Sequence, residues 1–108
     1  MKTVESPLPR PLPIQLPLDQ ILEFCRRNHI RRLALYGSVL RDDFRPESDI
    51  DVLVQFEPGK APGLAFFTMQ DELTNIFGRK VDLNTEGDLS KYFVEEVLCE
   101  AVPIYVAA

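Results

Sequence analysis

Residues 35–54, LYGSVLRDDFRPESDIDVLV, are the most informative stretch for the fold, because they join the end of one apolar run to a second apolar run through a glycine-serine pair and a polar loop. The first run, 32–36, predicts a short strand, and a brief helical turn is expected at 39–43. The second run, 49–56, alternates at its start and then becomes apolar, which predicts a mostly buried strand. The chain between the two strands is too short for a crossover helix. The sequence therefore predicts a mixed sheet.

Two apolar stripes at helical spacing flank these strands. Leu18, Ile21, Leu22 and Cys25 recur at i, i+3, i+4 and i+7, which predicts an amphipathic helix. A second stripe is expected to end at Gly78. That second helix is expected over 66–77. The remaining expected elements are a strand over 80–84, a helix over 94–101 stopped by a proline, and an edge strand over 104–106. The predicted fold class is α/β, of the α+β kind, with a small mixed sheet flanked by helices.

The first 17 residues differ in composition from the rest of the chain. Five of the nine prolines fall between Pro7 and Pro17, and such a segment can form neither a helix nor a central strand. We expect residues 1–17 to be a flexible proline-rich arm. The folded domain is then expected to span 18–108.

Charge and composition exclude several functional classes. Twelve Lys and Arg against seventeen Asp and Glu give a net charge of −5, which disfavours direct nucleic-acid binding. No apolar run is long enough for a membrane span and the N-terminus lacks a secretory signal, so the cytosol is the expected compartment. Cys25 and Cys99 are expected to be reduced core residues. With His29 as the single histidine, a zinc site has almost no ligands available.

Three aspartates stand on or beside predicted strands. Asp49 and Asp51 are two residues apart, so their side chains share one face, and Asp82 interrupts an apolar strand in the same way. Like charges this close repel, and Mg²⁺ is the natural counter-ion for hard carboxylate oxygens. If the two strands are neighbours, the three carboxylates could hold two metal ions for displacement at phosphorus.

The glycine-serine pair after the first strand adds a second feature. Gly37 lets the backbone approach a ligand closely, and Ser38 adds a hydroxyl where phosphate groups bind. A structural alternative stays open for each group. The pair could form a simple turn, Asp49 could cap the strand, Asp51 could pair with Arg41 or Arg45, and Asp82 could lie on an exposed face.

The spacing of these residues resembles a known family. Gly37-Ser38, ten intervening residues and Asp49-x-Asp51 are similar to the signature of the DNA polymerase β-like nucleotidyltransferase superfamily. The surrounding sequence resembles that of the minimal nucleotidyltransferases (MNT), the MntA-type antitoxins of HEPN/MNT toxin–antitoxin systems. The segments that carry this resemblance are 35–41, 45–54, 78–83, 96–98 and 100–102, and the likeness covers about 18–106.

The resemblance implies a small nucleotidyltransferase fold and a role for each matching residue. It implies that Gly37 and Ser38 bind the triphosphate and that Asp49 and Asp51 hold Mg²⁺, two ions in all. It implies that Asp82 is the third metal ligand and the base for the incoming hydroxyl. The same three aspartates are the implied catalytic residues, and ATP is the implied substrate.

The resemblance also implies a partner, a HEPN-domain RNase toxin that such antitoxins silence by transferring AMP to a tyrosine. Two other functions stay open at this point. The chain could be a non-catalytic module that covers its partner, or a nucleotidyltransferase acting on a small molecule or RNA. Nucleotide and metal binding separate the first alternative from the enzyme, and the identity of the acceptor separates the second.

Overall fold

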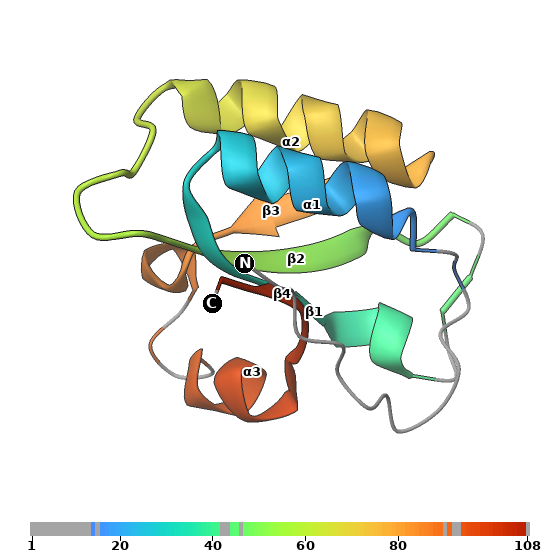
Figure 1. Cartoon of the computed structure of the whole chain (residues 1–108). Coiled ribbons are helices and arrows are strands. Elements are labelled where there is room, and N and C mark those ends of the chain that lie inside the picture. Colours follow the sequence, from blue (N-terminus) through green and yellow to red (C-terminus); the bar gives the residue numbers. More distant parts are fainter. Residues whose placement is uncertain are drawn as a thin grey trace.

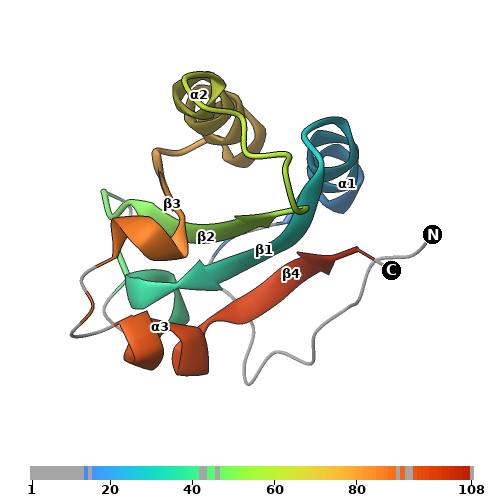
Figure 2. The same cartoon turned by 90° about the vertical axis from the view of Figure 1, so that its left-hand side faces the viewer.

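The computed structural model describes residues 14, 16–41, 44, 45, 47–89, 91 and 94–107. Its strands form one four-stranded sheet, with two long helices on one face and the short helical segments on the other (Figures 1 and 2). In chain order the elements are α1 (Leu18–Arg27), β1 (Ile30–Tyr36), η1 (Gly37–Leu40), β2 (Ile50–Phe56), α2 (Ala65–Phe77), β3 (Val81–Asn84), η2 (Glu86–Asp88), α3 (Val94–Glu100) and β4 (Val102–Val106).

The sheet is mixed, as the sequence predicts. Its strand order is β3-β2-β1-β4, and β1 pairs antiparallel with both β2 and β4. The pairing of β2 with β3 is parallel, because α2 crosses over between them. The predicted fold class, a small mixed sheet flanked by helices, is confirmed.

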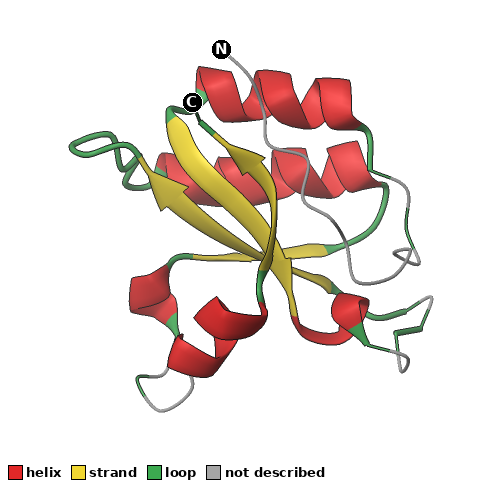
Figure 3. Ribbon diagram, turned by 60° about the horizontal axis from the view of Figure 1, so that its bottom comes forward, coloured by secondary structure: helices red, strands yellow, loops and turns green. Residues whose placement is uncertain are grey.

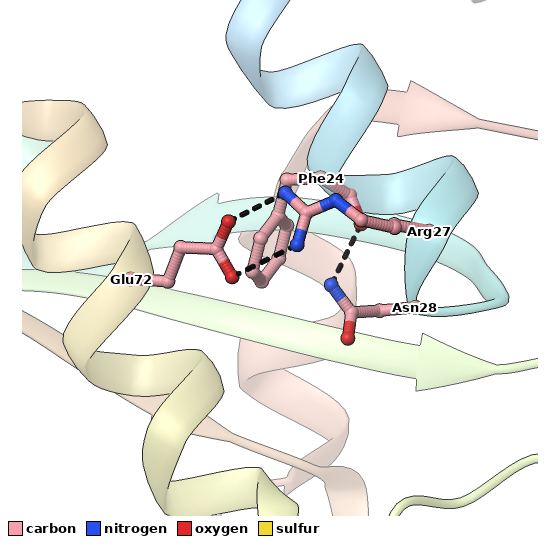
Figure 4. Close-up of polar contacts among 4 residues, drawn as sticks. All are labelled: Phe24, Arg27, Asn28 and Glu72. Atoms are coloured by element: carbon pink, nitrogen blue, oxygen red, sulfur yellow. Dashed lines mark hydrogen bonds and ion pairs between the residues drawn. The ribbon is translucent and has the colours of Figure 1, made fainter.

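The main core lies between the sheet and the helices α1 and α2. Phe24 and Leu73 are fully buried there, against strand residues such as Leu33 and Val52. At the end of α1 the guanidinium of Arg27 donates two hydrogen bonds to the Glu72 carboxylate on α2 (Figure 4). In the same view, the Asn28 amide donates to the carbonyl of Phe24 at 2.8 Å and closes the helix. The two long helices therefore form one layer.

A smaller apolar cluster lies on the other face of the sheet. Tyr36, Leu53 and Val97 form its buried part, with Leu89 and Ala101 packed against them. Figure 3 shows α3 and the short helical segments on this side of the strands, across from the two long helices. The helix α3 has only seven residues, and of these Val97 alone is buried.

The edge strand β3 is protected by side chains of α2. The backbone N–H of Val81 donates to the Thr74 hydroxyl at 3.1 Å, and that of Leu83 donates to the Gln70 amide oxygen at 2.9 Å. These two α2 residues are four apart, so both face β3. They satisfy donors that an open edge would otherwise offer to another strand.

The element boundaries differ from the prediction in two instructive places. The helical turn expected at 39–43 is a 3₁₀ segment that already begins at Gly37, so the glycine-serine pair belongs to it. Pro103, expected to stop the last helix, lies inside β4. A proline is tolerated there because β4 is an edge strand, and the β1–β4 register shifts beside it, between Leu33 and Ala34.

The cysteine prediction is half wrong. Both thiols are free, and Cys25 is buried in the main core, where burial raises its pKa to about 12. Cys99 is exposed. Val97 is the buried residue of α3, and a residue two positions later lies on the opposite side of a helix.

Two further predictions meet the limits of the described residues. The first four prolines of the expected arm, which end with Pro13, lie outside the described residues. Asp42 and Asp43 of the expected helical turn also lie outside them. The first helix begins at Leu18, directly after Pro17. Among the described residues, no helix has the length and apolar character needed to cross a lipid bilayer.

Candidate functional site

All five candidate residues lie at one end of the sheet. Gly37 and Ser38 follow the end of β1, and β1 runs antiparallel to β2, so they lie near the start of β2. Asp49 and Asp51 stand at that start. Asp82 is the second residue of β3, which runs parallel to β2 and begins at the same end.

The strand register places three polar side chains in one row across the sheet. Tyr36 of β1 is the register partner of Asp51, and Asp51 is the partner of Asp82. Register partners point to the same face, here the face of α3. The expected proximity of Asp51 and Asp82 is therefore present in the structure. Asp51 is half-buried and Asp82 is exposed.

The surroundings of Asp51 disfavour the negative charge of its carboxylate. Burial raises the pKa of its carboxyl to about 6, and the charges of Asp82 and Asp49 add to the rise. Arg41 acts in the opposite direction, but its guanidinium pairs with Glu100 at 3.5 Å. Asp51 forms no ion pair with any described residue, so the alternative of an Asp51–arginine pair does not hold for these residues.

Asp49 has a different environment. Its Oδ2 lies 3.8 Å from the Nζ of Lys80, and both side chains are well exposed. Such a pair contributes little stability and is easily exchanged for another partner.

The carboxylates alone do not make a closed metal site. Across the described ranges, no three Asp, Glu, His or Cys side chains are grouped as ready ligands for a metal ion. Mg²⁺ usually takes only one or two carboxylates and completes its shell with water and substrate phosphates. The oxygens of Asp49 and Asp51 fit that chemistry, and the repulsion at Asp51 is what a cation would relieve.

Gly37 is required by its surroundings. Its φ is +79°, in the left-handed region that disfavours a side chain. A Cβ at this position would overlap the Oδ2 atom of Asp51 and lie 3.2 Å from its Cγ. The turn that would receive phosphate therefore packs directly against the carboxylate that would hold the metal.

Sequence reasoning did not single out two polar residues of this face. The Asn84 amide donates a hydrogen bond to the Tyr36 hydroxyl at 3.1 Å. Burial raises the pKa of Tyr36, the Asn84 bond opposes this, and the charges of Asp51, Asp82 and Asp88 raise it further. The signal was available, since Asn84 is two residues after Asp82 and so shares its face.

Comparison with known proteins gives a consistent result. The family model described as "Nucleotidyltransferase domain" matches residues 18–104 of this chain. The protein adenylyltransferase MntA of Thermococcus cleftensis is 32% identical over 81 residues, which cover 74% of this chain and 80% of the relative.

Two solved complexes contain chains of the same fold. One is described as a toxin–antitoxin with AMP-PNP, with a TM-score of 0.69 and 20% identity, covering 85% of this chain and 75% of the other. The second is described as the tri-AMPylated Shewanella oneidensis HEPN toxin in complex with MNT antitoxin. Its TM-score is 0.60 at 20% identity, and the match covers 83% of this chain and 70% of the other. At these identities the likeness concerns the fold.

Proposed function

The chain belongs to the nucleotidyltransferase domain family, and from this premise we propose that it transfers AMP from ATP to a tyrosine hydroxyl of a HEPN-domain toxin and so acts as its antitoxin. The named relative, a protein adenylyltransferase, supports a protein as the acceptor. The complex with the AMPylated HEPN toxin supports the class of partner, and the complex with AMP-PNP supports ATP as the donor.

The observation that carries the proposal is the order of groups across the sheet. The glycine-serine turn follows β1, Asp51 stands on β2, and Asp82 stands beside it on β3. A phosphate cradle, a metal-binding carboxylate and a second acid thus follow one another along a line. This order suits transfer at phosphorus, where leaving group and nucleophile lie on opposite sides of the reacting atom.

Each of the five candidate residues has a task in this reaction. Ser38 and the backbone of the Gly37 turn would receive the triphosphate, and Asp49 and Asp51 would hold Mg²⁺, with Asp82 as the third ligand. Bound magnesium would supply charge stabilisation for the phosphates and for the transition state. The exposed Asp82 carboxylate accepts the proton of the attacking hydroxyl. A phenol, with an ordinary pKa of about 10, loses that proton more readily than an alcohol.

The experiment is incubation of the purified chain with ATP, Mg²⁺ and the HEPN-domain protein encoded beside it. We expect intact-mass spectrometry to find additions of about 329 Da, the mass of one transferred AMP group, on the HEPN protein. Fragment spectra then locate the acceptor, which we expect to be a tyrosine. RNase activity of the HEPN protein should fall as the modified fraction rises.

The controls separate chemistry from binding. The double variant Asp49→Asn/Asp51→Asn should give no mass change, whereas Asp19→Asn/Asp71→Asn, which alters two exposed helix acids, should transfer normally. Silencing of the RNase without any mass change, even by the Asp49→Asn/Asp51→Asn variant, would replace the proposal with a binding antitoxin. AMP found on RNA or on a small molecule instead of the protein would point to another acceptor class.

A further inference from the structure

A pocket of about 490 Å³ opens beside Asp82, and apart from Asp82 none of its lining residues has a part in the phosphate or metal chemistry described above. It lies between the carboxyl ends of β2 and β3, the first turns of α2, and η2. Its apolar wall includes Phe56, Pro62, Phe66 and Phe67, and its polar side includes Asp82 and Asp88. No residue of β1 or η1 lines it, so it lies on the β3 side of the candidate site.

The apolar wall contains three phenylalanine rings in contact, and the last of them is exposed to solvent. The rings of Phe56 and Phe66 pack edge to face with centroids 6.4 Å apart, and those of Phe66 and Phe67 do the same at 6.4 Å. Phe67 keeps 67% of its surface exposed. The fold leaves most of this ring in solvent, so its surface is free to pack against the side chain of a partner.

The polar side of the pocket is acidic. Asp82 and Asp88 are its ionisable lining residues, and both are exposed. The carboxylate of Asp88 is fixed by Thr85, whose backbone N–H and hydroxyl donate to it at 2.9 and 3.1 Å. A second phosphate group would be repelled here, whereas a peptide with basic residues beside its reactive side chain would be attracted.

We propose that this pocket is the acceptor site, which holds the aromatic, hydroxyl-bearing side chain of the protein substrate against Phe66 and Phe67. The inference rests on the proposed function and adds the place where its substrate binds. In-line transfer requires the nucleophile to enter opposite the departing pyrophosphate. With the phosphates at the turn after β1, the opposite side is that of β3, where Asp82 and the pocket lie.

The chemical step balances with the groups named. The acceptor oxygen forms a bond to the α-phosphorus of ATP, and the bond from that phosphorus to the oxygen bridging the β-phosphate breaks. Pyrophosphate leaves with the electron pair of the broken bond. The phenol proton passes to the Asp82 carboxylate, which forms part of the pocket wall.

The test is steady-state AMP transfer to the neighbouring HEPN protein by Phe67→Ser. The KM for the HEPN protein should rise about tenfold, the usual loss for an aromatic contact at a protein interface. Because Phe67 is exposed, thermal unfolding should be unchanged. Both kcat and the KM for ATP should stay within about twofold of the unaltered chain.

Two further variants complete the design. Leu18→Ser, at an exposed apolar residue that does not line the pocket, should leave both KM values unchanged. Ala61→Arg places a long side chain at an exposed lining position and should raise the acceptor KM as Phe67→Ser does.

Each other outcome overturns the inference in a distinguishable way. If the unaltered chain transfers AMP but both pocket variants keep its acceptor KM, the pocket assignment is wrong and the proposed function stands. If the KM for ATP rises instead, the pocket holds the adenine base and not the acceptor. If the unaltered chain transfers no AMP to the HEPN protein, the proposed function fails and the acceptor site fails with it.

Discussion

The two faces of the sheet differ in what their side chains do. The face under α1 and α2 is closed by sixteen buried residues in one apolar cluster. The face under α3 has three buried residues in its cluster, and beside them Asp51 and Asp82 stand next to each other. Among the described residues, the first face buries no charged side chain, whereas the second places like charges together with little apolar cover.

On the proposed function, one face of the sheet supplies stability and the other supplies the chemistry. Alternate residues of a strand point to opposite faces, so β2 contributes Ile50, Val52 and Val54 to the core and Asp51 to the candidate site. The core therefore positions the strand that carries the Asp51 carboxylate. Changes on the two faces should therefore affect different measurements.

The largest effect on folding is expected from the closed face. Phe24→Ala removes a fully buried ring and should lower the free energy of unfolding by about 3–5 kcal/mol. Urea denaturation measures this loss. AMP transfer per folded molecule should be unchanged, because Phe24 lies in the core cluster on the face opposite the aspartates.

The matched control is Phe67→Ala, which removes the same ring from an exposed position. It should change the free energy of unfolding by no more than about 0.5 kcal/mol. Equal losses from both variants would mean that the two positions share one packing environment, and the contrast between the faces would fail.

A smaller effect on folding, with a large effect on transfer, is expected at Gly37. Gly37→Ala and Gly78→Ala both place a side chain at a positive φ, +79° and +74°, and each should cost about 1–2 kcal/mol of folding free energy. A Cβ at Gly78 meets nothing within 4 Å, whereas a Cβ at Gly37 meets the carboxylate of Asp51.

The two glycine variants should therefore separate strain from displacement of the carboxylate. Gly37→Ala should reduce AMP transfer about a hundredfold, since a misplaced catalytic group costs this much. Gly78→Ala should transfer normally once the folded fraction is matched. Similar transfer rates for both would show that the contact between Gly37 and Asp51 has no part in the reaction.

Most of the fold follows from local patterns in the sequence. The helices and the strands β1 to β3 come from apolar periodicity, and the mixed sheet follows from the short connection between β1 and β2. Pro103 misled the prediction because its place on an edge strand depends on strand order. Cys99 misled it because apolar neighbours in sequence do not fix which side of a seven-residue helix is covered.

The candidate site was predictable to a different degree. The spacing of Gly37, Asp49 and Asp51 can be read directly from the sequence, and Asp82 follows from its apolar strand. The Tyr36–Asn84 hydrogen bond and the pocket beside Asp82 depend on strand register and on the position of α2. Such long-range placement has no local signal, so these features required the structure.

The central claim is that Asp51 serves the reaction at the expense of the fold, and Asp51→Asn tests it most directly. The folded-state pKa of Asp51, about 6, is above the ordinary value of 3.8, so the folded chain binds its proton more tightly than the unfolded chain. In metal-free buffer, the free energy of unfolding should therefore fall as the pH rises from about 4 to about 6. Asp51→Asn should remove that component.

The decisive measurement is unfolding and AMP transfer of Asp51→Asn side by side at pH 7. We expect its free energy of unfolding in metal-free buffer to equal or exceed that of the unaltered chain. Transfer should fall by about a thousandfold or more, because several kcal/mol of transition-state stabilisation are lost. A variant that is clearly less stable, or that still transfers AMP at a near-normal rate, would contradict the account.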